Sequence, residues 1–355
     1  MRIVSVVGTR PQLIKAAALL PALRSRHDEI FVDTGQHYDE AMAGSFFAEL
    51  GLPRPDHSLG IGGGSQAEQT GRMLPAVEAV LVAERPDVVL VYGDTNSTLA
   101  GALASSKLRI PVAHVEAGLR SFDRTMPEEL NRVLVDRVSS LLFAPSDAAV
   151  ANLQAEGITE GVHQVGDVML DANLRLAPIA RERSQALELA GVEPAAYALA
   201  TVHRESNTRQ PALGRIVDAL NELEEPVVVP LHPRTAGAIE SNGLRLEGHV
   251  HPRPPAGYLD FAALASQARV ILTDSGGVQK EAYWYEVPCV TLRENTEWVE
   301  TVETGWNRLV GTDTGAIVSA TREAGPGTEH PPIYGDGHAA DLIADVLSTI
   351  GPSEA

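Results

Sequence analysis

The chain has 355 residues, of which 44% are hydrophobic, and a formal net charge of −19. The length predicts two domains around large cores, and the negative charge argues against nucleic acid and anionic membranes as partners. The only cysteine, Cys289, excludes an internal disulfide and a zinc site built from several cysteines. Because the N-terminus turns polar early and no apolar run reaches membrane-spanning length, we expect a cytoplasmic protein.

In the first half of the chain, short apolar runs alternate with longer amphipathic segments. The apolar runs predict strands at Ile3–Val7, Glu29–Asp33, Val88–Tyr92, Val112–Val115 and Leu141–Ala144. The segments between them predict helices at Gln12–Arg26, Asp39–Leu50, Gln66–Glu84, Ser97–Lys107, Glu128–Val138 and Asp147–Glu156.

The second half follows the same scheme, although no repeat is visible in the amino-acid sequence itself. Strands are predicted at Ala198–Val202, Pro226–Pro230, Arg245–Leu246, Val270–Thr273, Cys289–Leu292 and Arg308–Val310. Helices are predicted at Leu174–Leu189, Pro211–Leu223, Arg234–Ser241, Tyr258–Ser266, Gly276–Tyr285, Glu297–Glu303 and His338–Ile350.

This alternation predicts an α/β fold with two Rossmann-like, doubly wound parallel sheets. We expect an N-terminal domain at residues 1–168, a C-terminal domain at 169–336, and a helix in 337–355 that packs back on the N-terminal domain. Ligands of such sheets bind beyond the carboxyl ends of the strands. Functional side chains are therefore expected where the strands end, on two domains that face one another across a cleft.

The stretch from Leu272 to Glu281 predicts a nucleotide site. An apolar strand is followed by Ser275, Gly276 and Gly277 and then by a helix, an arrangement that points free backbone N–H groups at a phosphate. Glu281, about one and a half turns into the helix, is placed to accept hydrogen bonds from the vicinal hydroxyls of a ribose. Taken alone, the stretch fits a tight turn with a solvated glutamate equally well.

Three carboxylates follow strands or begin a helix in the first half. Asp94 follows the strand Val88–Tyr92, Glu116 follows the next strand, and Glu128 stands at a helix start. A helix-capping role explains any one of them. Three carboxylates at the same edge of the predicted sheet are better explained by general acid–base chemistry, in which crowding separates the pKa values of neighbouring carboxyl groups. Without a His-x-x-x-His pair or several cysteines, no catalytic metal is expected.

Basic and aromatic residues stand near the other strand ends. Gly8 and Arg10 follow the first strand in a sequence that matches neither the dinucleotide fingerprint nor the phosphate loop. We expect Arg10 to neutralise a diphosphate, and Lys15 either to do the same or to cap a surface turn. His203 ends the first strand of the second half, where it can bind phosphate, move protons or serve only the structure. Core packing is the simplest role for Phe261, with base stacking as the alternative.

In combination these residues resemble the non-hydrolysing UDP-N-acetylglucosamine 2-epimerase family. The motifs that carry the resemblance span the chain from Gly8 to about Gly311, in order and at the family's spacing. They are Gly8-Thr9-Arg10-Pro11, Thr34-Gly35-Gln36-His37, Gly93-Asp94-Thr95, His114-Val115-Glu116-Ala117-Gly118-Leu119-Arg120, Pro127-Glu128-Glu129-x-Asn131-Arg132, His203-Arg204-x-x-Asn207 and Thr273-Asp274-Ser275-Gly276-Gly277-Val278-Gln279.

The resemblance implies a fold of the glycosyltransferase-B type, a homodimer, and reversible inversion at C2 of a UDP-sugar without metal or nicotinamide. A base would remove the C2 proton while UDP leaves C1, and UDP would re-add to the resulting glycal after reprotonation on the other face. By resemblance the acid–base residues are Asp94, Glu116 and Glu128, with His203 as a further catalytic group. By resemblance Arg10 and His203 contact the diphosphate, Ser275 and Gly276 form the phosphate turn, Glu281 binds the ribose and Phe261 contacts the uracil. The strand-end residues Lys15, Gly277 and Arg293 are expected to complete the UDP site. A second, regulatory site would use Gln36, Arg72 and His232.

The substrate is open between two UDP-sugars. The main expectation is conversion of UDP-N-acetylglucosamine to UDP-N-acetylmannosamine. However, Trp298 stands where family members that act on this sugar often have arginine. Together with Tyr92, this makes the chain look more like relatives that epimerise UDP-2,3-diacetamido-2,3-dideoxyglucuronate. A glycosyltransferase on the same scaffold and a catalytically silent sensor of nucleotide sugars are the remaining alternatives.

Overall fold

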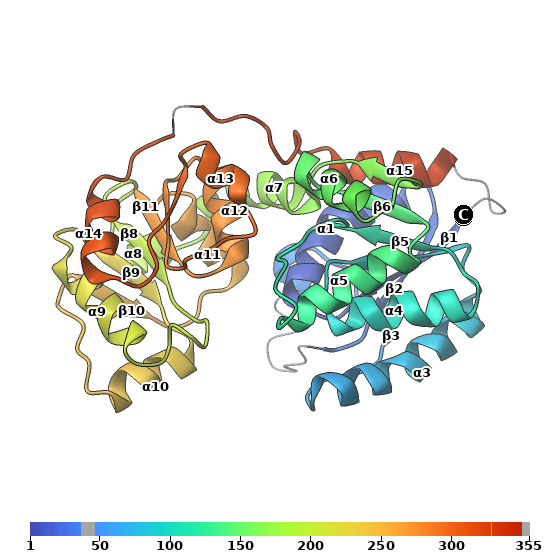
Figure 1. Ribbon diagram of the computed structural model, residues 1–355, viewed down its shortest axis with the longest axis horizontal. Coiled ribbons are helices and arrows are strands. Elements are labelled where there is room, and N and C mark those ends of the chain that lie inside the picture. Colours follow the sequence, from blue (N-terminus) through green and yellow to red (C-terminus); the bar gives the residue numbers. More distant parts are fainter. Residues whose placement is uncertain (37–46, 328, 350–355) are drawn as a thin grey trace. The chain divides into compact units, whose positions relative to one another are not determined.

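The computed structural model describes residues 1–36, 47–327 and 329–349, and the chain divides into two compact units (Figure 1). The first unit comprises Met1–Arg175 and the segment that begins at Pro332, and the second unit is Leu176–Pro331. The division falls within helix α7 (Val168–Arg183), whereas the sequence analysis placed the boundary at residues 168 and 169.

Within the described residues, the sheet of the first unit has seven strands that all pair in parallel, in the order β3-β2-β1-β4-β5-β6-β7. The strands are β1 (Arg2–Val7), β2 (Asp28–Asp33), β3 (His57–Ser58), β4 (Val88–Tyr92), β5 (Val112–Val115), β6 (Leu141–Ala144) and β7 (Val162–Gln164). The central strands are almost wholly apolar, as expected for strands that helices cover on both faces.

Helices pack on both faces of this sheet. They are α1 (Arg10–Arg24), α3 (Gln66–Glu84), α4 (Asn96–Lys107), α5 (Pro127–Val138), α6 (Asp147–Ala155) and α15 (Ala339–Thr349). One hydrophobic cluster joins Val77 of α3, Leu99 of α4 and Val135 of α5 to strand residues such as Val6 and Val91. Burial of these side chains stabilises the unit by about 25 cal/mol for each Å² of apolar surface removed from water.

The C-terminal helix α15 lies beside α1 (Figure 1). Arg26, just after α1, forms an ion pair with Asp345. The carboxylate of Asp171 accepts hydrogen bonds from the backbone N–H groups of Ala339 and Ala340, at 3.3 and 2.7 Å. Asp171 therefore caps the first turn of α15, although it stands far earlier in the chain.

The second unit repeats the architecture with six described strands, all paired in parallel, in the order β10-β9-β8-β11-β12-β13. The strands are β8 (Ala198–Thr201), β9 (Val227–Pro230), β10 (Val250–Arg253), β11 (Val270–Thr273), β12 (Cys289–Thr291) and β13 (Asn307–Leu309). The helices are α8 (Ala186–Ala190), α9 (Ala212–Glu222), α10 (Pro233–Ser241), α11 (Tyr258–Ala265), α12 (Gly276–Trp284), α13 (Val299–Glu303) and α14 (Thr314–Arg322).

The two faces of this second sheet have separate hydrophobic clusters. On one face, Ile216 of α9 and Ile317 of α14 pack against Leu272. On the other face, Leu264 of α11 and Ala282 of α12 pack with their own set of strand residues. The predicted fold class, with two doubly wound parallel sheets, is confirmed.

Several predicted elements differ from the structure. The strand predicted at Arg245–Leu246 is wrong, because the strand beside β9 is β10, Val250–Arg253. The edge strands β3 and β7 and the helix α14 were not predicted. Most of the helix predicted at Asp39–Leu50 lies outside the described residues, as does Ile350 at the end of the predicted C-terminal helix. None of the described helices has the length and hydropathy needed to cross a membrane.

The strand orders identify where each unit offers a ligand site. In the first sheet the chain changes direction of winding between β1 and β4, and in the second sheet between β8 and β11. Loops that leave the carboxyl ends of such adjacent strands run to opposite faces of the sheet and leave a crevice. The predicted site residues Arg10 and Asp94 follow the first pair of strands, and His203 and Ser275 follow the second pair.

Candidate functional site

In the first unit, Gln12 joins the two loops at the switch between β1 and β4. Its Oε1 atom accepts hydrogen bonds from the backbone N–H groups of Gly8 (2.8 Å) and Thr9 (3.1 Å). Its Nε2 atom donates to the carbonyl oxygen of Tyr92 (2.6 Å) and lies 2.9 Å from Oγ1 of Thr95. The buried amide therefore fixes the loop that carries Arg10, which is exposed at the first position of α1, against the loop that carries Asp94. Sequence reasoning assigned no role to Gln12.

The carboxylate of Asp94 is held by helix α5. Arg132 forms an ion pair with Asp94 and lies 3.2 Å from a carboxylate oxygen of Glu129. The side chain of Asn131 donates to the backbone carbonyl of Asp94 at 2.9 Å. Contacts from two successive residues of α5 thus restrain both the backbone and the side chain of Asp94, as acid–base chemistry with a positioned group requires.

Glu116 stands in a strained turn and pairs with a lysine. Its backbone has φ = 72°, in the left-handed region where a residue with a Cβ atom is disfavoured. Its carboxylate forms a largely buried ion pair with Lys15 of α1. A Cβ atom at Gly93 would lie 3.3 Å from Oε2 of Glu116 and 3.4 Å from Nζ of Lys15. Gly93 therefore leaves the space that this ion pair occupies.

A hollow of about 220 Å³ lies at this edge of the first unit. Asp94 and Glu128 both line it, together with Thr9, Pro11, Gln36 and Asn131. Glu128 is exposed on the first turn of α5. Among the described residues, the structure thus brings Asp94 and Glu128 to one hollow, while Glu116 lies beside Gly93, next to Asp94, but is not part of the hollow's lining.

A buried polar network supports the two loops that follow β4 and β5. Nδ1 of His114 lies 2.6 Å from Asp136, and Nε2 of His114 lies 2.7 Å from the carbonyl oxygen of Gly93. Asp136 also accepts from the N–H of Gly118 (3.1 Å) and from Arg120 (2.7 Å). Burial alone would raise the pKa of Asp136, but His114 and Arg120 lower it below the ordinary value. Asp136 and Arg120 hold the loops and were not predicted as site residues.

In the second unit, the predicted phosphate turn has the expected form. Ser275 precedes α12 with extended backbone, and Gly276 and Gly277 are the first residues of the helix. The hydroxyl of Ser275 makes no capping hydrogen bond to the helix, so it can bind a ligand. The N–H of Ser275 is held by Oγ1 of Thr273 at 3.0 Å. The N–H groups of the first turn of a helix such as α12 are suited to bind an anion, and phosphate binding here stays a prediction.

Glu281 and Phe261 occupy different environments in this unit. Burial raises the pKa of Glu281 to about 7, and the charge of Lys280 opposes this effect. A buried carboxyl group whose pKa is near 7 is able to accept hydrogen bonds from ribose hydroxyls. The contact between Glu281 and a ribose stays a prediction. Phe261 is half-buried and packs against the cluster that contains Leu264, so part of its ring serves the core.

His203 follows β8, with its side chain about half exposed, and lies against Asp274. Nδ1 of His203 is 3.1 Å from the buried carboxylate of Asp274. The same carboxylate accepts from the backbone N–H groups of His203 (3.1 Å) and Arg204 (3.0 Å) and from Nδ2 of Asn207 (3.2 Å). Asp274 lay within a quoted motif, but the sequence analysis gave it no role.

The loop after β12 places Arg293 and Trp298. Arg293 is bound by both carboxylate oxygens of Glu297, at 2.9 and 3.0 Å, so much of its hydrogen-bonding capacity serves the loop. Trp298 is buried, and its Nε1 atom is 3.2 Å from the position that a Cβ atom at Gly276 would take. Nζ of Lys280 lies 4.0 Å from the centroid of the Trp298 ring. Trp298 therefore borders the phosphate turn.

The three residues predicted for regulation lie in different places. Gln36 lines the same hollow as Asp94, and its Oε1 accepts from the N–H and hydroxyl of Ser97 at 2.9 and 2.7 Å. His37, from the same motif, lies outside the described residues. Arg72, in α3, donates to the carbonyl oxygens of Gly62 and Gly63 in the loop before that helix. His232 belongs to the second unit, where its Nδ1 caps α10.

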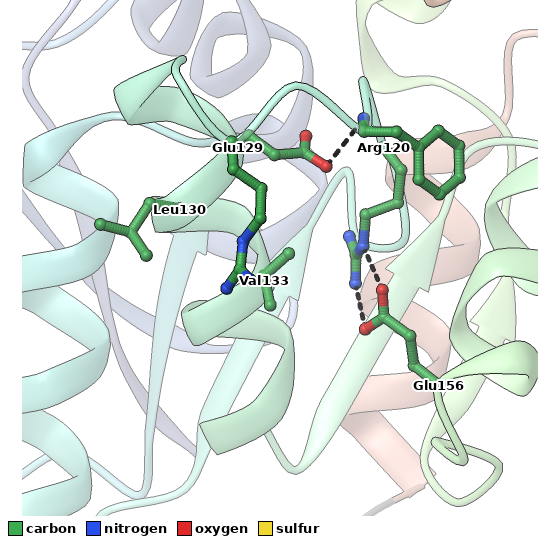
Figure 2. A pocket seen from close by; sticks show the side chains of 7 residues that line it. Arg120, Glu129, Leu130, Val133 and Glu156 are labelled. Carbon is green, nitrogen blue, oxygen red and sulfur yellow. Dashed lines mark hydrogen bonds and ion pairs between the residues drawn. The ribbon is translucent and has the colours of Figure 1, made fainter.

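A second hollow of about 270 Å³ lies on the other side of α5 in the first unit (Figure 2). In Figure 2, Arg120 and Glu156 form a two-pronged ion pair at one wall, with distances of 2.7 and 2.9 Å, and Leu130 and Val133 form another. Phe122 also lines the hollow, and its side chain is 77% exposed. Across the described ranges, no group of three or more His, Cys, Asp and Glu side chains is arranged to hold a metal ion.

Comparison with known proteins matches both the sequence and the fold. The model of the family described as UDP-N-acetylglucosamine 2-epimerase matches residues 22–348. Two relatives are each 48% identical, with 99% of this chain and 100% of the relative covered: a UDP-N-acetylglucosamine 2-epimerase homolog of Methanococcus maripaludis and a UDP-2,3-diacetamido-2,3-dideoxy-D-glucuronate 2-epimerase of Pseudomonas aeruginosa.

A similar solved structure is that of the UDP-GlcNAc 2-epimerase of Methanocaldococcus jannaschii in complex with UDP-GlcNAc and UDP. Its sequence is 42% identical to this chain, and the two structures superpose with a TM-score of 0.89. The superposition covers 98% of this chain and 100% of the chain of that epimerase. The family matched over most of the chain is the one that the sequence motifs predict. This chain therefore belongs to the UDP-N-acetylglucosamine 2-epimerase family.

Proposed function

We propose that this protein is an isomerase that reversibly inverts C2 of a UDP-N-acetylhexosamine, converting UDP-N-acetylglucosamine to UDP-N-acetylmannosamine. The observation that carries the proposal is the placement of carboxylates at the switch between β1 and β4. Asp94 and Glu128 line one hollow, and Glu116 lies beside the adjoining Gly93. The names of the relatives support the same reaction.

The proposed reaction proceeds by elimination and re-addition. A carboxylate removes the proton from C2, the C–H electron pair forms a double bond between C1 and C2, and the bond from C1 to the β-phosphate oxygen breaks with its electrons on UDP. Reprotonation of C2 on the opposite face and return of UDP to C1 give the epimer. Asp94, Glu116 and Glu128 are the proposed proton carriers, because a carboxyl group within hydrogen-bond reach of C2 can act as a general acid or base.

Most of the residues proposed to hold the departing UDP belong to the second unit. Ser275, Gly276 and Gly277 are proposed to bind the diphosphate together with His203, and Arg10 of the first unit is proposed as a further cationic partner. Support comes from the open hydroxyl of Ser275 and the half-exposed imidazole of His203. Glu281 is proposed to bind the ribose and Phe261 the uracil.

A second substrate, UDP-2,3-diacetamido-2,3-dideoxyglucuronate, is favoured by two observations. One relative at 48% identity is named for that sugar. In addition, Trp298 borders the phosphate turn, where an apolar ring replaces the charge of an arginine. Tyr92 cannot distinguish the two sugars by direct contact, because its side chain is fully buried in the core of the first unit.

We also propose a cytoplasmic homodimer. The buried thiol of Cys289, the only cysteine, suits a reducing compartment. Phe122 and Leu130, which line the hollow in Figure 2, and Leu134, which is also in α5, are exposed, and a second copy of the chain would bury them.

The experiment is incubation of the protein with each UDP-sugar separately, followed by proton NMR of the sugar signals. Formation of the C2 epimer from UDP-N-acetylglucosamine supports the main proposal, and formation only from the diacetamido glucuronate supports the second substrate. Transfer only when an acceptor is added would identify a glycosyltransferase, and no turnover of either sugar would contradict both epimerase proposals.

A further inference from the structure

The two units each contain a paired aspartate and histidine, and the pairs differ in one respect. In the first unit, Asp136 and His114 are both fully buried, and both ring nitrogens of His114 have protein partners. In the second unit, Asp274 is fully buried but the side chain of His203 is 51% exposed. Nε2 of His203 has no hydrogen-bond partner among the described residues. The first pair is closed, and the second is open to a ligand.

Asp274 is fixed in place by more than the imidazole. It follows β11 directly, and its carboxylate accepts two backbone N–H groups and the amide of Asn207 from the loop after β8. Burial alone would raise the pKa of Asp274, but the hydrogen bonds and charge of His203 lower it. Asp274 is thus an ionised acceptor, and a proton on Nδ1 of His203 satisfies it.

The geometry also links the imidazole to the phosphate turn. Asp274 immediately precedes Ser275, so one residue both holds His203 and begins the turn. The hydroxyls of Thr201 and Thr273, at the ends of the adjacent strands β8 and β11, lie 2.6 Å apart and fix the two loops together. The guanidinium of Arg204, next to His203, lies 3.7 Å from the carboxylate of Glu297 in the loop after β12.

We propose that Asp274 is a positioning residue for the diphosphate step: its carboxylate accepts the Nδ1–H of His203 and favours the doubly protonated ring, which presents Nε2–H to the diphosphate. This rests on the proposed function. As the bond from C1 to the β-phosphate oxygen breaks, the electron pair stays on that oxygen, and Nε2–H donates its hydrogen bond or its proton there. When UDP returns to C1, the proton returns to Nε2. The identity of one ring nitrogen's partner determines what the other nitrogen can do.

The first test needs no variant. Protein labelled with ¹⁵N at histidine is titrated with UDP, and the ¹⁵N and ¹H signals of His203 are assigned by comparison with His203→Gln. The inference predicts a proton on Nδ1 with and without UDP, and a change at Nε2 when UDP binds. A neutral ring with its proton on Nε2 and none on Nδ1 would overturn it. Because UDP alone is the probe, this result does not depend on whether the protein epimerises any sugar.

The second test is kinetic. In Asp274→Asn the amide oxygen still accepts the backbone N–H groups, while its NH₂ group can favour the tautomer with a bare Nδ1. We expect kcat to fall by roughly 10²- to 10⁴-fold, as for a misplaced imidazole tautomer in other enzymes, with KM changed only a few-fold. Asp136→Asn, at the closed pair, is the matched control. It should leave the ¹⁵N and ¹H NMR signals of His203 unchanged.

A double-variant cycle distinguishes positioning from a structural role. If Asp274 acts through His203, Asp274→Asn should have little further effect on kcat in a His203→Gln background. Equal loss of kcat in both backgrounds, or a kcat for Asp274→Asn within threefold of the unaltered protein, would contradict the inference. Absence of turnover by the unaltered protein would instead refute the proposed function and leave the NMR result to decide the role of Asp274.

Discussion

Lys15 and Glu116 form an ion pair whose side chains are only 8% and 13% exposed. Lys15 was predicted to bind a diphosphate at the end of the first strand. The structure gives it a partner within its own unit, on the turn where Glu116 adopts a left-handed backbone. The ion pair restrains the carboxylate of Glu116 beside Gly93. Lys15 therefore has a structural reason to be present besides any contact with substrate.

Lys15→Met should remove this charge from beside Glu116 and leave the largely buried carboxylate without its ion pair to Lys15. We expect a loss of about 3 kcal/mol in stability, together with a large loss of turnover. Adding Glu116→Gln should restore most of the stability but none of the turnover. Thermal unfolding and steady-state rates test both statements, with the exposed Lys107→Met as the control. Full activity in Lys15→Met would show that the pair does not serve catalysis.

Asp94→Asn, Glu116→Gln and Glu128→Gln should each lower kcat by roughly 10²- to 10⁴-fold, the range for loss of a general acid or base. The affinity for UDP should change only a few-fold, because none of the three is proposed to bind the nucleotide. Asp123→Asn, an exposed carboxylate that accepts hydrogen bonds only from Thr125, is the control. Near-normal rates in all three variants would refute the acid–base assignment.

Glu281 makes the stability of the protein depend on pH. Its pKa is about 7 in the folded state, compared with the usual 4.5 of a glutamate side chain. The folded protein therefore binds this proton more tightly than the unfolded chain does. The contribution is therefore fully present below pH 4.5 and is lost as the pH rises through about 7. At about 1.4 kcal/mol for each pKa unit, the whole effect is about 3 kcal/mol.

Glu281→Gln removes this titration while keeping the shape of the side chain. We expect the variant to gain stability relative to the unaltered protein as the pH is raised from 4.5 to 8.5. Melting temperatures measured across this range test it, and the exposed Glu303→Gln should show no such trend. A constant difference between Glu281→Gln and the unaltered protein would mean that the carboxyl group titrates as in the unfolded chain.

The exposed apolar side chains around α5 predict a self-association surface. Phe122, Leu130 and Leu134 are 77%, 53% and 41% exposed. Leu130→Glu should shift the protein from dimer toward monomer in analytical ultracentrifugation, because a carboxylate in the centre of an apolar interface is costly to desolvate. Leu189→Glu, at another exposed leucine, is the control. A monomeric unaltered protein, or a dimer in the Leu130→Glu variant, would contradict this surface.

Central strands could be predicted from the sequence because helices bury them on both faces. The strands at Val88–Tyr92 and Val270–Thr273 have continuous apolar runs, and the structure has the same bounds. Edge strands lack that signal. The strand Val250–Arg253 contains Pro252, which an edge position tolerates, and its apolar content is low, so the prediction fell on Arg245–Leu246 instead.

The candidate site was predictable where chemistry lies next to a strand end, as for Asp94, His203 and Ser275. Residues that act through tertiary contacts were not. Gln12 joins two loops that are 80 residues apart in the chain, and Asp274 joins its turn to a loop 70 residues earlier. A buried polar residue at a strand end, beside a motif, was the available signal, but the sequence does not show what it contacts.

The most direct measurement of the central claim is the epimerisation of UDP-N-acetylglucosamine in heavy water, followed by proton NMR and mass spectrometry, with the diacetamido glucuronate tested in parallel. Because the proposed carboxylates exchange protons with solvent while the glycal is bound, the account predicts deuterium at C2 of the product epimer. Formation of the epimer with the original C2 proton fully retained would contradict proton transfer through these carboxylates.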